Sequence, residues 1–391
     1  MYFDLSDEEK EIKARAAAFV DEVCKPLEDR WAFDDYDMPA EDLFHVARKF
    51  KEYGLRGLSV PKEVGGLGLG TVAKCLVYEE IMRSHVVHGN LTTYSGFLEP
   101  SPALHQAPEW QKEKYLYPIL QDEKFFHIHI SEPGAGSDAA NIRTTAIRDG
   151  GHFIINGTKR WAPPPVHPIV VPSYLLCYAV TSPEKGHRGI STILVDYPTP
   201  GLTIGEEYRT HATGSLGRAC DYHYKDVAVP VENMLGEEGS GFHYLMDQLN
   251  RNRVAIGAGY IGKMRWAQRR AIARAKERET FGKPLADRQA IQWMIAENEI
   301  EIEQLSNMVY KAAWLLDQGR DPRSEVAMVK AVAAVYGGNV VDRAIQIHGG
   351  LGVIEQTRLI QLAGEARVGR IAEGSTEAMK MIIAKEALRR G

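Results

Sequence analysis

The C-terminal part of the chain constrains the fold most strongly, because its apolar side chains recur at three- and four-residue steps. Ile302, Leu305 and Val309 follow one another in this way, which places apolar side chains along one face of a helix. The stretches with this pattern cover residues 242–278, 290–316, 324–347 and 377–388. Long helices joined by short connections predict a four-helix bundle.

The middle of the chain has a different pattern, with short alternating stretches from about residue 125. Asp149-Gly150 and Asn156-Gly157 separate some of these stretches, and both dipeptides favour hairpin turns. Strands at this spacing, without helices between them, predict an antiparallel barrel or sandwich.

The N-terminal part reads as helical. Ser6 and Glu9 form the sequence pattern of a capping box at the start of the first helix. Further helix-like stretches cover residues 41–53, 71–82 and 109–116. The expected fold class is therefore α+β and multi-domain. It comprises an N-terminal helical domain (1–122), a middle antiparallel β-domain (123–232) and a C-terminal four-helix bundle (233–391).

Composition excludes several classes of partner. The formal net charge is −5 and no run of Lys or Arg stands out, so we expect neither nucleic acid nor an anionic membrane as partner. Four cysteines without a Cys-x-x-Cys pair indicate reduced thiols, and the acidic N-terminus lacks the apolar core of a signal peptide. We therefore expect a cytoplasmic protein. His127 and His129 are not joined by a third ligand at suitable spacing, so we expect no metal site.

The stretch SEPGAGSD at residues 131–138 is a candidate ligand loop at the end of a strand. Pro133 fixes one backbone angle, while Gly134 and Gly136 free the following ones, so the segment should form a tight loop. Small residues let a flat ligand approach the backbone N–H groups. Ser131 and Ser137 add hydroxyls that can donate or accept hydrogen bonds.

Four other stretches carry groups suited to binding or chemistry. RETFGKPL begins at Arg278, QIHGGLG begins at Gln346, and IAEGSTE contains Glu373. The fourth, LNRNR, ends at Arg253 within the first long helix of the bundle. Taken one at a time, the first three of these stretches could be a solvated arginine with a buried phenylalanine, an ordinary helix C-cap and a charged loop residue.

In their order along the chain, these stretches make the sequence resemble the acyl-CoA dehydrogenases, a family of FAD-dependent flavoproteins with this order of domains. The resemblance covers nearly the whole chain, from about Leu5 to Leu388. The matching motifs begin at Val60, Ser131, Asp226, Thr280, Gln346 and Glu373.

The resemblance implies that FAD lies between the β-domain and the bundle. Ser131 and Trp161 would contact its isoalloxazine ring. Arg278 and Phe281, followed closely by Gln289, would meet the pyrophosphate of an FAD held mainly by a neighbouring subunit.

The same resemblance implies roles at the end of the chain. Gln346, Gly349 and Gly350 would serve the adenine half of the cofactor, again across a subunit boundary. Ser375 and Glu377 fall where the last motif of the family touches the cofactor. Such sharing implies a homodimer at least, and commonly a homotetramer.

On the substrate side, Ser137, Arg253 and Gly374 match residues that help to hold an acyl-CoA thioester. Oxidation to the α,β-enoyl thioester removes an α-proton and a β-hydride. The proton needs a carboxylate whose pKa is raised by a dry pocket, and the hydride goes to the flavin. Glu373 is the expected base. In some relatives the base comes from the first bundle helix near Asn252, where an amide cannot act. The electron acceptor would be a separate protein such as an electron-transferring flavoprotein.

Two segments depart from the family pattern. The run Trp161-Ala162-Pro163-Pro164-Pro165 lacks the hydroxyl residue that usually follows the tryptophan, and proline has no N–H to replace it. His127 and His129 stand where apolar or small residues are usual. An imidazole near the flavin and histidines packed in the barrel both remain open. Two alternative functions also remain open. One is a flavin oxidase or monooxygenase that acts on a non-CoA substrate, and the other is a flavin-bearing scaffold without turnover.

Overall fold

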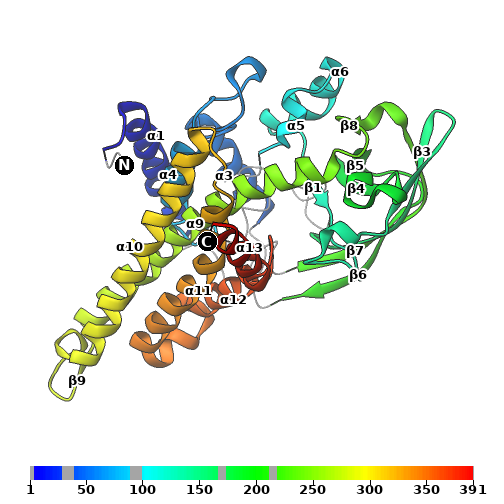
Figure 1. The fold of residues 1–391 in the computed structure, drawn as a ribbon. Coiled ribbons are helices and arrows are strands. Elements are labelled where there is room, and N and C mark those ends of the chain that lie inside the picture. Colours follow the sequence, from blue (N-terminus) through cyan, green and yellow to red (C-terminus); the bar gives the residue numbers. More distant parts are fainter. Residues whose placement is uncertain (1–3, 29–38, 89–98, 166–172, 211–217, 391) are drawn as a thin grey trace.

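The computed structural model describes residues 4–28, 39–88, 99–165, 173–210 and 218–390 (Figure 1). Its first part is helical, and the capping box is confirmed. The Glu9 N–H donates to Ser6 Oγ (3.2 Å), and the Ser6 N–H donates to Glu9 Oε2 (2.7 Å). The helices are α1 (Asp7–Phe19), α2 (Lys25–Glu28), α3 (Ala40–Glu52), α4 (Thr71–Ile81), α5 (Pro102–His105), α6 (Glu109–Gln111) and α7 (Tyr117–Leu120).

The middle part forms one sheet of eight strands, with the order β6-β7-β3-β2-β4-β5-β8 and with β1 beside β4. The strands are β1 (Phe126–His129), β2 (Thr145–Asp149), β3 (His152–Ala162), β4 (Tyr174–Val180), β5 (Ile190–Asp196), β6 (Leu202–Arg209), β7 (Arg218–Pro230) and β8 (Met234–Leu235). Most neighbours are antiparallel, as expected. However, β4 pairs in parallel with β1, and with β2 at Thr145 and Val180.

Strand β4 connects the sheet to the helices. Its side chains are apolar at nearly every position, and they alternate between two cores. Tyr174, Leu176 and Tyr178 pack with residues of the N-terminal helices and with Leu245 of the bundle. The intervening side chains, such as Cys177, fill the interior of the β-domain. The β-domain is therefore held against helices that come from both ends of the chain.

The third part is the bundle, in which long helices lie side by side (Figure 1). Its elements are α9 (Gly241–Glu277), β9 (Glu279–Thr280), β10 (Lys283–Pro284), α10 (Gln289–Asp317), α11 (Arg323–His348), α12 (Leu359–Gly369) and α13 (Thr376–Arg390). Gly257 and Gly262 allow close packing in the middle of α9. A Cβ at Gly257 would collide with Val329, and one at Gly262 would collide with the backbone of Glu79.

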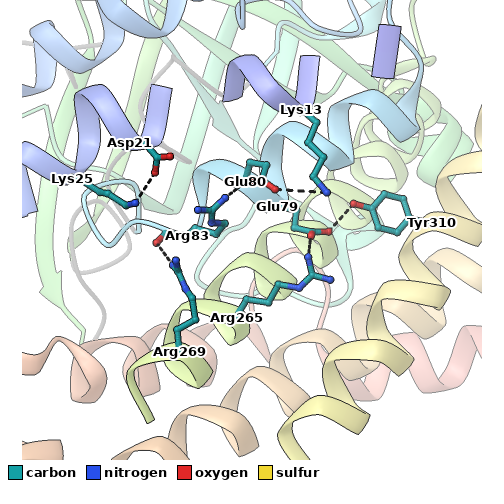
Figure 2. Close-up of polar contacts among 9 residues, drawn as sticks. All are labelled: Lys13, Asp21, Lys25, Glu79, Glu80, Arg83, Arg265, Arg269 and Tyr310. Atoms are coloured by element: carbon teal, nitrogen blue, oxygen red, sulfur yellow. Dashed lines mark hydrogen bonds and ion pairs between the residues drawn. The ribbon is translucent and has the colours of Figure 1, made fainter. Parts of the chain in front are cut away.

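Polar contacts tie the N-terminal helices to the bundle (Figure 2). The buried Glu79 on α4 accepts hydrogen bonds from Arg265 of α9 and from the Tyr310 hydroxyl of α10 (2.6 Å to Oε2). The neighbouring Glu80 pairs with Lys13 of α1 (3.7 Å) and with Arg83. Because buried charges are costly unless they are paired, these contacts favour a single docking geometry of the helices.

Candidate active site

Glu373 lies in the short segment between α12 and α13. Its backbone has a φ of +57°, a conformation that is unfavourable for a residue with a side chain and is therefore held by its surroundings. Glu373 Oε2 is buried and has no hydrogen-bond partner among the described residues. Burial raises the pKa of this carboxyl, while the positive charges of Arg253 and Lys330 act in the opposite direction. The result is a carboxylate with increased proton affinity, as a general base requires.

Two buried cations hold the backbone around Glu373. Arg253 of α9 donates from Nε to the Glu373 carbonyl oxygen (2.9 Å), across 120 residues of chain. Lys330 of α11 donates from Nζ to the carbonyl oxygens of Gly369 (2.8 Å) and Gly374 (3.0 Å). The structure therefore brings together Arg253, Glu373 and Gly374, three of the residues selected from the sequence. Lys330 was not selected, although a lysine within the apolar stretch of residues 326–334 is a signal that could have identified it.

The next two predicted residues lie at the start of α13. Ser375 Oγ accepts a hydrogen bond from the Ala378 N–H (3.2 Å), so Ser375 acts as the N-terminal cap of the helix. Glu377 is exposed in the first turn of the same helix. Both residues therefore follow directly on the segment that carries Glu373.

The loop at residues 131–138 is a tight turn anchored by a buried ion pair. The Glu132 N–H donates to the Ala135 carbonyl oxygen (2.9 Å), and the Ala135 N–H donates back to the Glu132 carbonyl (3.1 Å). The Glu132 carboxylate accepts from Lys159 Nζ (2.9 Å) and from the N–H groups of Arg143 (2.6 Å) and Thr144 (2.9 Å). Ser137 is exposed. Glu132 and Lys159 shape the loop, but the sequence pattern alone gave them no role.

Trp161 lies beside this loop, because the N–H of its neighbour Arg160 donates to the Ser131 carbonyl oxygen (2.8 Å). The indole is 56% exposed, and its backbone φ is +72°. Its ring lies 5.2 Å from the ring of Tyr208, centroid to centroid. The Arg160 guanidinium is fixed by two 2.7 Å hydrogen bonds to Asp221. An exposed, rigidly held indole next to an open loop can stack on a flat ligand.

The two histidines of β1 are buried inside the β-domain. His129 Nδ1 lies 2.7 Å from the Tyr224 hydroxyl, and its ring centroid lies 4.4 Å from that of Tyr222. Burial, followed by the nearby His127 and Lys159, lowers the pKa of His129 well below its ordinary value. His129 is therefore a neutral, packed side chain. Tyr222 in turn donates to the Pro163 carbonyl oxygen (2.8 Å), so this cluster supports the proline segment after Trp161.

The remaining predicted residues lie elsewhere in the bundle. Phe281 is 98% exposed in the turn between β9 and β10. This hairpin lies far from the eight-stranded sheet (Figure 1). Arg278 and Gln289 flank this hairpin and are also exposed. The exposed residues at the end of α11 are Gln346, Gly349 and Gly350. Arg253 and Arg278 are separated by 25 residues of sequence, or about 37 Å along a helix axis, so Arg278 lies far from the contact between Arg253 and Glu373.

The described residues contain no group of three or more His, Cys, Asp or Glu side chains that could hold a metal ion. No helix in the described part of the chain is long and apolar enough to cross a membrane.

A helical domain, a small β-domain and a helical bundle, with a buried carboxyl and an exposed indole, define a class of α+β enzymes. Three models of the acyl-CoA dehydrogenase family match the chain in succession. They are the N-terminal domain (residues 6–123), the middle domain (128–227) and the C-terminal domain (239–388). The chain therefore belongs to the acyl-CoA dehydrogenase family.

Curated relatives match the chain over its whole length. The 3-(aryl)acrylate reductase of Clostridium sporogenes is 32% identical over 390 residues, and CarC, a subunit of the caffeyl-CoA reductase-Etf complex of Acetobacterium woodii, is 34% identical over 392 residues. Both alignments cover 100% of each chain. Among solved structures, the FAD complex of PigA is similar with a TM-score of 0.90 and 25% identity, again over 100% of both chains.

These comparisons confirm the family, the α+β fold class and the class of enzyme, an oxidoreductase of the acyl-CoA dehydrogenase family. FAD, the cofactor expected from the sequence, is the cofactor with which PigA was solved.

Proposed function

We propose that this protein is an FAD-dependent acyl-CoA dehydrogenase in which Glu373 removes the α-proton of an acyl-CoA thioester. The observation that carries the proposal is the Glu373 carboxyl itself, which combines a strained backbone, a buried Oε2 without a partner and a raised pKa. The unpaired Oε2 can accept a proton, and the raised pKa favours its binding, as a general base requires. The rate of substrate oxidation should therefore rise with pH through the raised pKa.

The residues present fit the proposed cofactor. The exposed indole of Trp161 and the open glycines at 134 and 136 leave room for a flat ring beside the loop. When bound, FAD would supply the hydride acceptor of the reaction. Ser131 and Trp161 would orient its ring, while Ser137, Arg253 and Gly374 would hold the thioester.

The proposed reaction can run in either direction, depending on which partner exchanges electrons with the flavin. CarC belongs to a reductase-Etf complex, which supports an electron-transferring flavoprotein as the partner of this chain as well. We also propose a cytoplasmic location, since Cys24, Cys75, Cys177 and Cys220 are all free and buried.

We further propose a homo-oligomer, a dimer or a tetramer. Arg278, at the base of the hairpin that carries Phe281, is 25 residues from Arg253 in the sequence, or about 37 Å along a helix axis. If the hairpin serves a cofactor, it serves the one in another subunit. A phenylalanine that is 98% exposed at the tip of a hairpin supports this arrangement, because such a side chain is otherwise unfavourable in water.

A second candidate function is a flavin oxidase or monooxygenase that acts on a non-CoA substrate. It is favoured by Pro163 and its neighbours, which remove the usual hydroxyl after Trp161. The fold of this chain is also similar to that of PigA, which was solved with FAD and proline (TM-score 0.89).

The experiment that separates the two functions is an anaerobic titration of the purified protein with a panel of acyl-CoA thioesters. Bleaching of the flavin absorbance by a member of the panel supports the dehydrogenase. The reduced protein should in turn regain its absorbance with the matching 2-enoyl-CoA. Glu373→Gln should retain FAD and lose bleaching. Failure of every thioester, with rapid NAD(P)H-linked oxygen uptake, would favour the second function.

A further inference from the structure

Lys330 connects the two ends of the segment that carries Glu373. Its ammonium donates to the carbonyl of Gly369, at the end of α12, and to the carbonyl of Gly374, directly after Glu373. The side chain is 2% exposed. A single buried cation thus bridges both ends of residues 369–374.

Burial of a lysine in this position is unfavourable, and of its charged neighbours only Glu373 favours the charged form. Burial lowers the pKa of Lys330 to about 8, although the charge of Glu373 acts to raise it and that of Arg253 to lower it further. Capping the C-terminus of α12 would require only the hydrogen bond to the Gly369 carbonyl. Water or an exposed side chain could donate that bond. The second bond, to Gly374, acts on the residue next to the base.

The following groups, from other helices packed against α11, neither pair with Lys330 nor replace its hydrogen bond to Gly374. From α9 and α12, Lys263 and Glu365 form their own buried pair (2.7 Å). From α13, the apolar Met379 packs against Ala327 and Ala331 of α11. Glu373 and Arg253 are therefore the charged groups that act on Lys330.

We propose that Lys330 is a positioning residue for the reaction: its ammonium fixes the Gly374 carbonyl, and with it the strained backbone of Glu373, and its charge keeps the Glu373 carboxylate ready to accept a proton. This inference rests on the proposed function of Glu373. It assigns Lys330 no contact with the substrate.

The test uses the FAD-bound protein and a thioester that bleaches its flavin, and it follows the rate of flavin reduction against pH. In Lys330→Met, loss of the positive charge should move the midpoint of the pH profile upward by about one unit. The maximal rate should fall about tenfold or more, because a loosened base loses its alignment. The apparent affinity for the thioester should change by less than about threefold.

Two further variants separate this role from a general loss of stability. Lys330→Arg keeps the charge but not the geometry of the ammonium, so it should restore the midpoint while the maximal rate stays below that of the wild type. Lys263→Met removes another buried lysine of the bundle and should leave the midpoint unchanged. If Lys330→Met fails to retain FAD, Lys330→Arg decides, and a wild-type rate in that variant would overturn the geometric role.

An unshifted midpoint and an undiminished rate in Lys330→Met would overturn the role of Lys330 while leaving Glu373 as the base. If no thioester reduces the wild-type protein, the proposed function fails first, and this inference fails with it.

Discussion

Replacing Lys159 by methionine is expected to destabilise the protein, because it leaves the buried Glu132 carboxylate without its positively charged partner. In the native structure Lys159 is fully buried, and it donates to Glu132 Oε1 (2.9 Å) and to the Ile130 carbonyl (3.0 Å). Burial acts to raise the pKa of Glu132, but the charge of Lys159 and the hydrogen bonds more than offset it and lower that pKa. Lys159→Met would leave this carboxylate buried without its counter-charge.

Removing one partner of a buried ion pair costs about 3–5 kcal/mol. We expect a value near the lower end, about 3 kcal/mol, because the N–H groups of Arg143 and Thr144 still donate to the carboxylate. Glu132→Gln should have a similar effect, since it leaves the ammonium unpaired. In the double variant neither charge is present, so its loss should be smaller than the sum of the two single losses.

The assay is urea unfolding at pH 7, followed by circular dichroism, with FAD retention measured on the same samples. The matched control is Lys25→Met, which breaks an exposed pair with Asp21 (2.6 Å) and should cost less than about 1 kcal/mol. A loss below about 1 kcal/mol for Lys159→Met, or additive losses in the double variant, would refute the reasoning. FAD retention should fall in the single variants, because Glu132 shapes the loop next to Ser131.

Two further outcomes are expected, one on pH and one on assembly. Burial lowers the pKa values of His85 and His88 to about 3, so below pH 6.5 the unfolded chain takes up protons that the folded chain does not. The free energy of unfolding should thus fall by about 2 kcal/mol per histidine between pH 7 and pH 5, and the double variant His85→Gln/His88→Gln should show a shallower slope in urea titrations. Phe281→Ser should weaken self-association and FAD retention in sedimentation and flavin-release measurements, whereas Phe44→Ser, at another exposed ring, should change neither. Unchanged assembly in Phe281→Ser would contradict the cross-subunit role.

The sequence predicted those elements whose signal is local. Periodic apolar side chains identified the long helices, and α9, α10 and α11 extend close to the expected limits. The turn dipeptide Asp149-Gly150 marked the connection between β2 and β3. Strand β6 gives only a weak signal in the sequence, because a glycine and two glutamates in LTIGEEYR interrupt its alternating pattern.

The sequence also identified Glu373 and Arg253 as candidates, but not the contact between them. Their motifs resemble those of a family, and such a match names residues without giving distances. The parallel pairing of β4 with β1 and β2 could not be predicted from the sequence either, because strand partners are selected by packing across the whole β-domain.

By itself, then, the sequence determined the order of the domains, the family and the residues that could carry the chemistry, since periodicity, turn residues and motifs are properties of neighbouring residues. The tertiary structure alone decided which cations hold Glu373, which ion pair anchors the loop at 131–138, and that His129 is packed rather than exposed. These features depend on burial and on groups as far apart as Arg253 and Glu373. A carboxylate or an ammonium acquires its altered pKa only when folding removes water and brings a distant charge into contact.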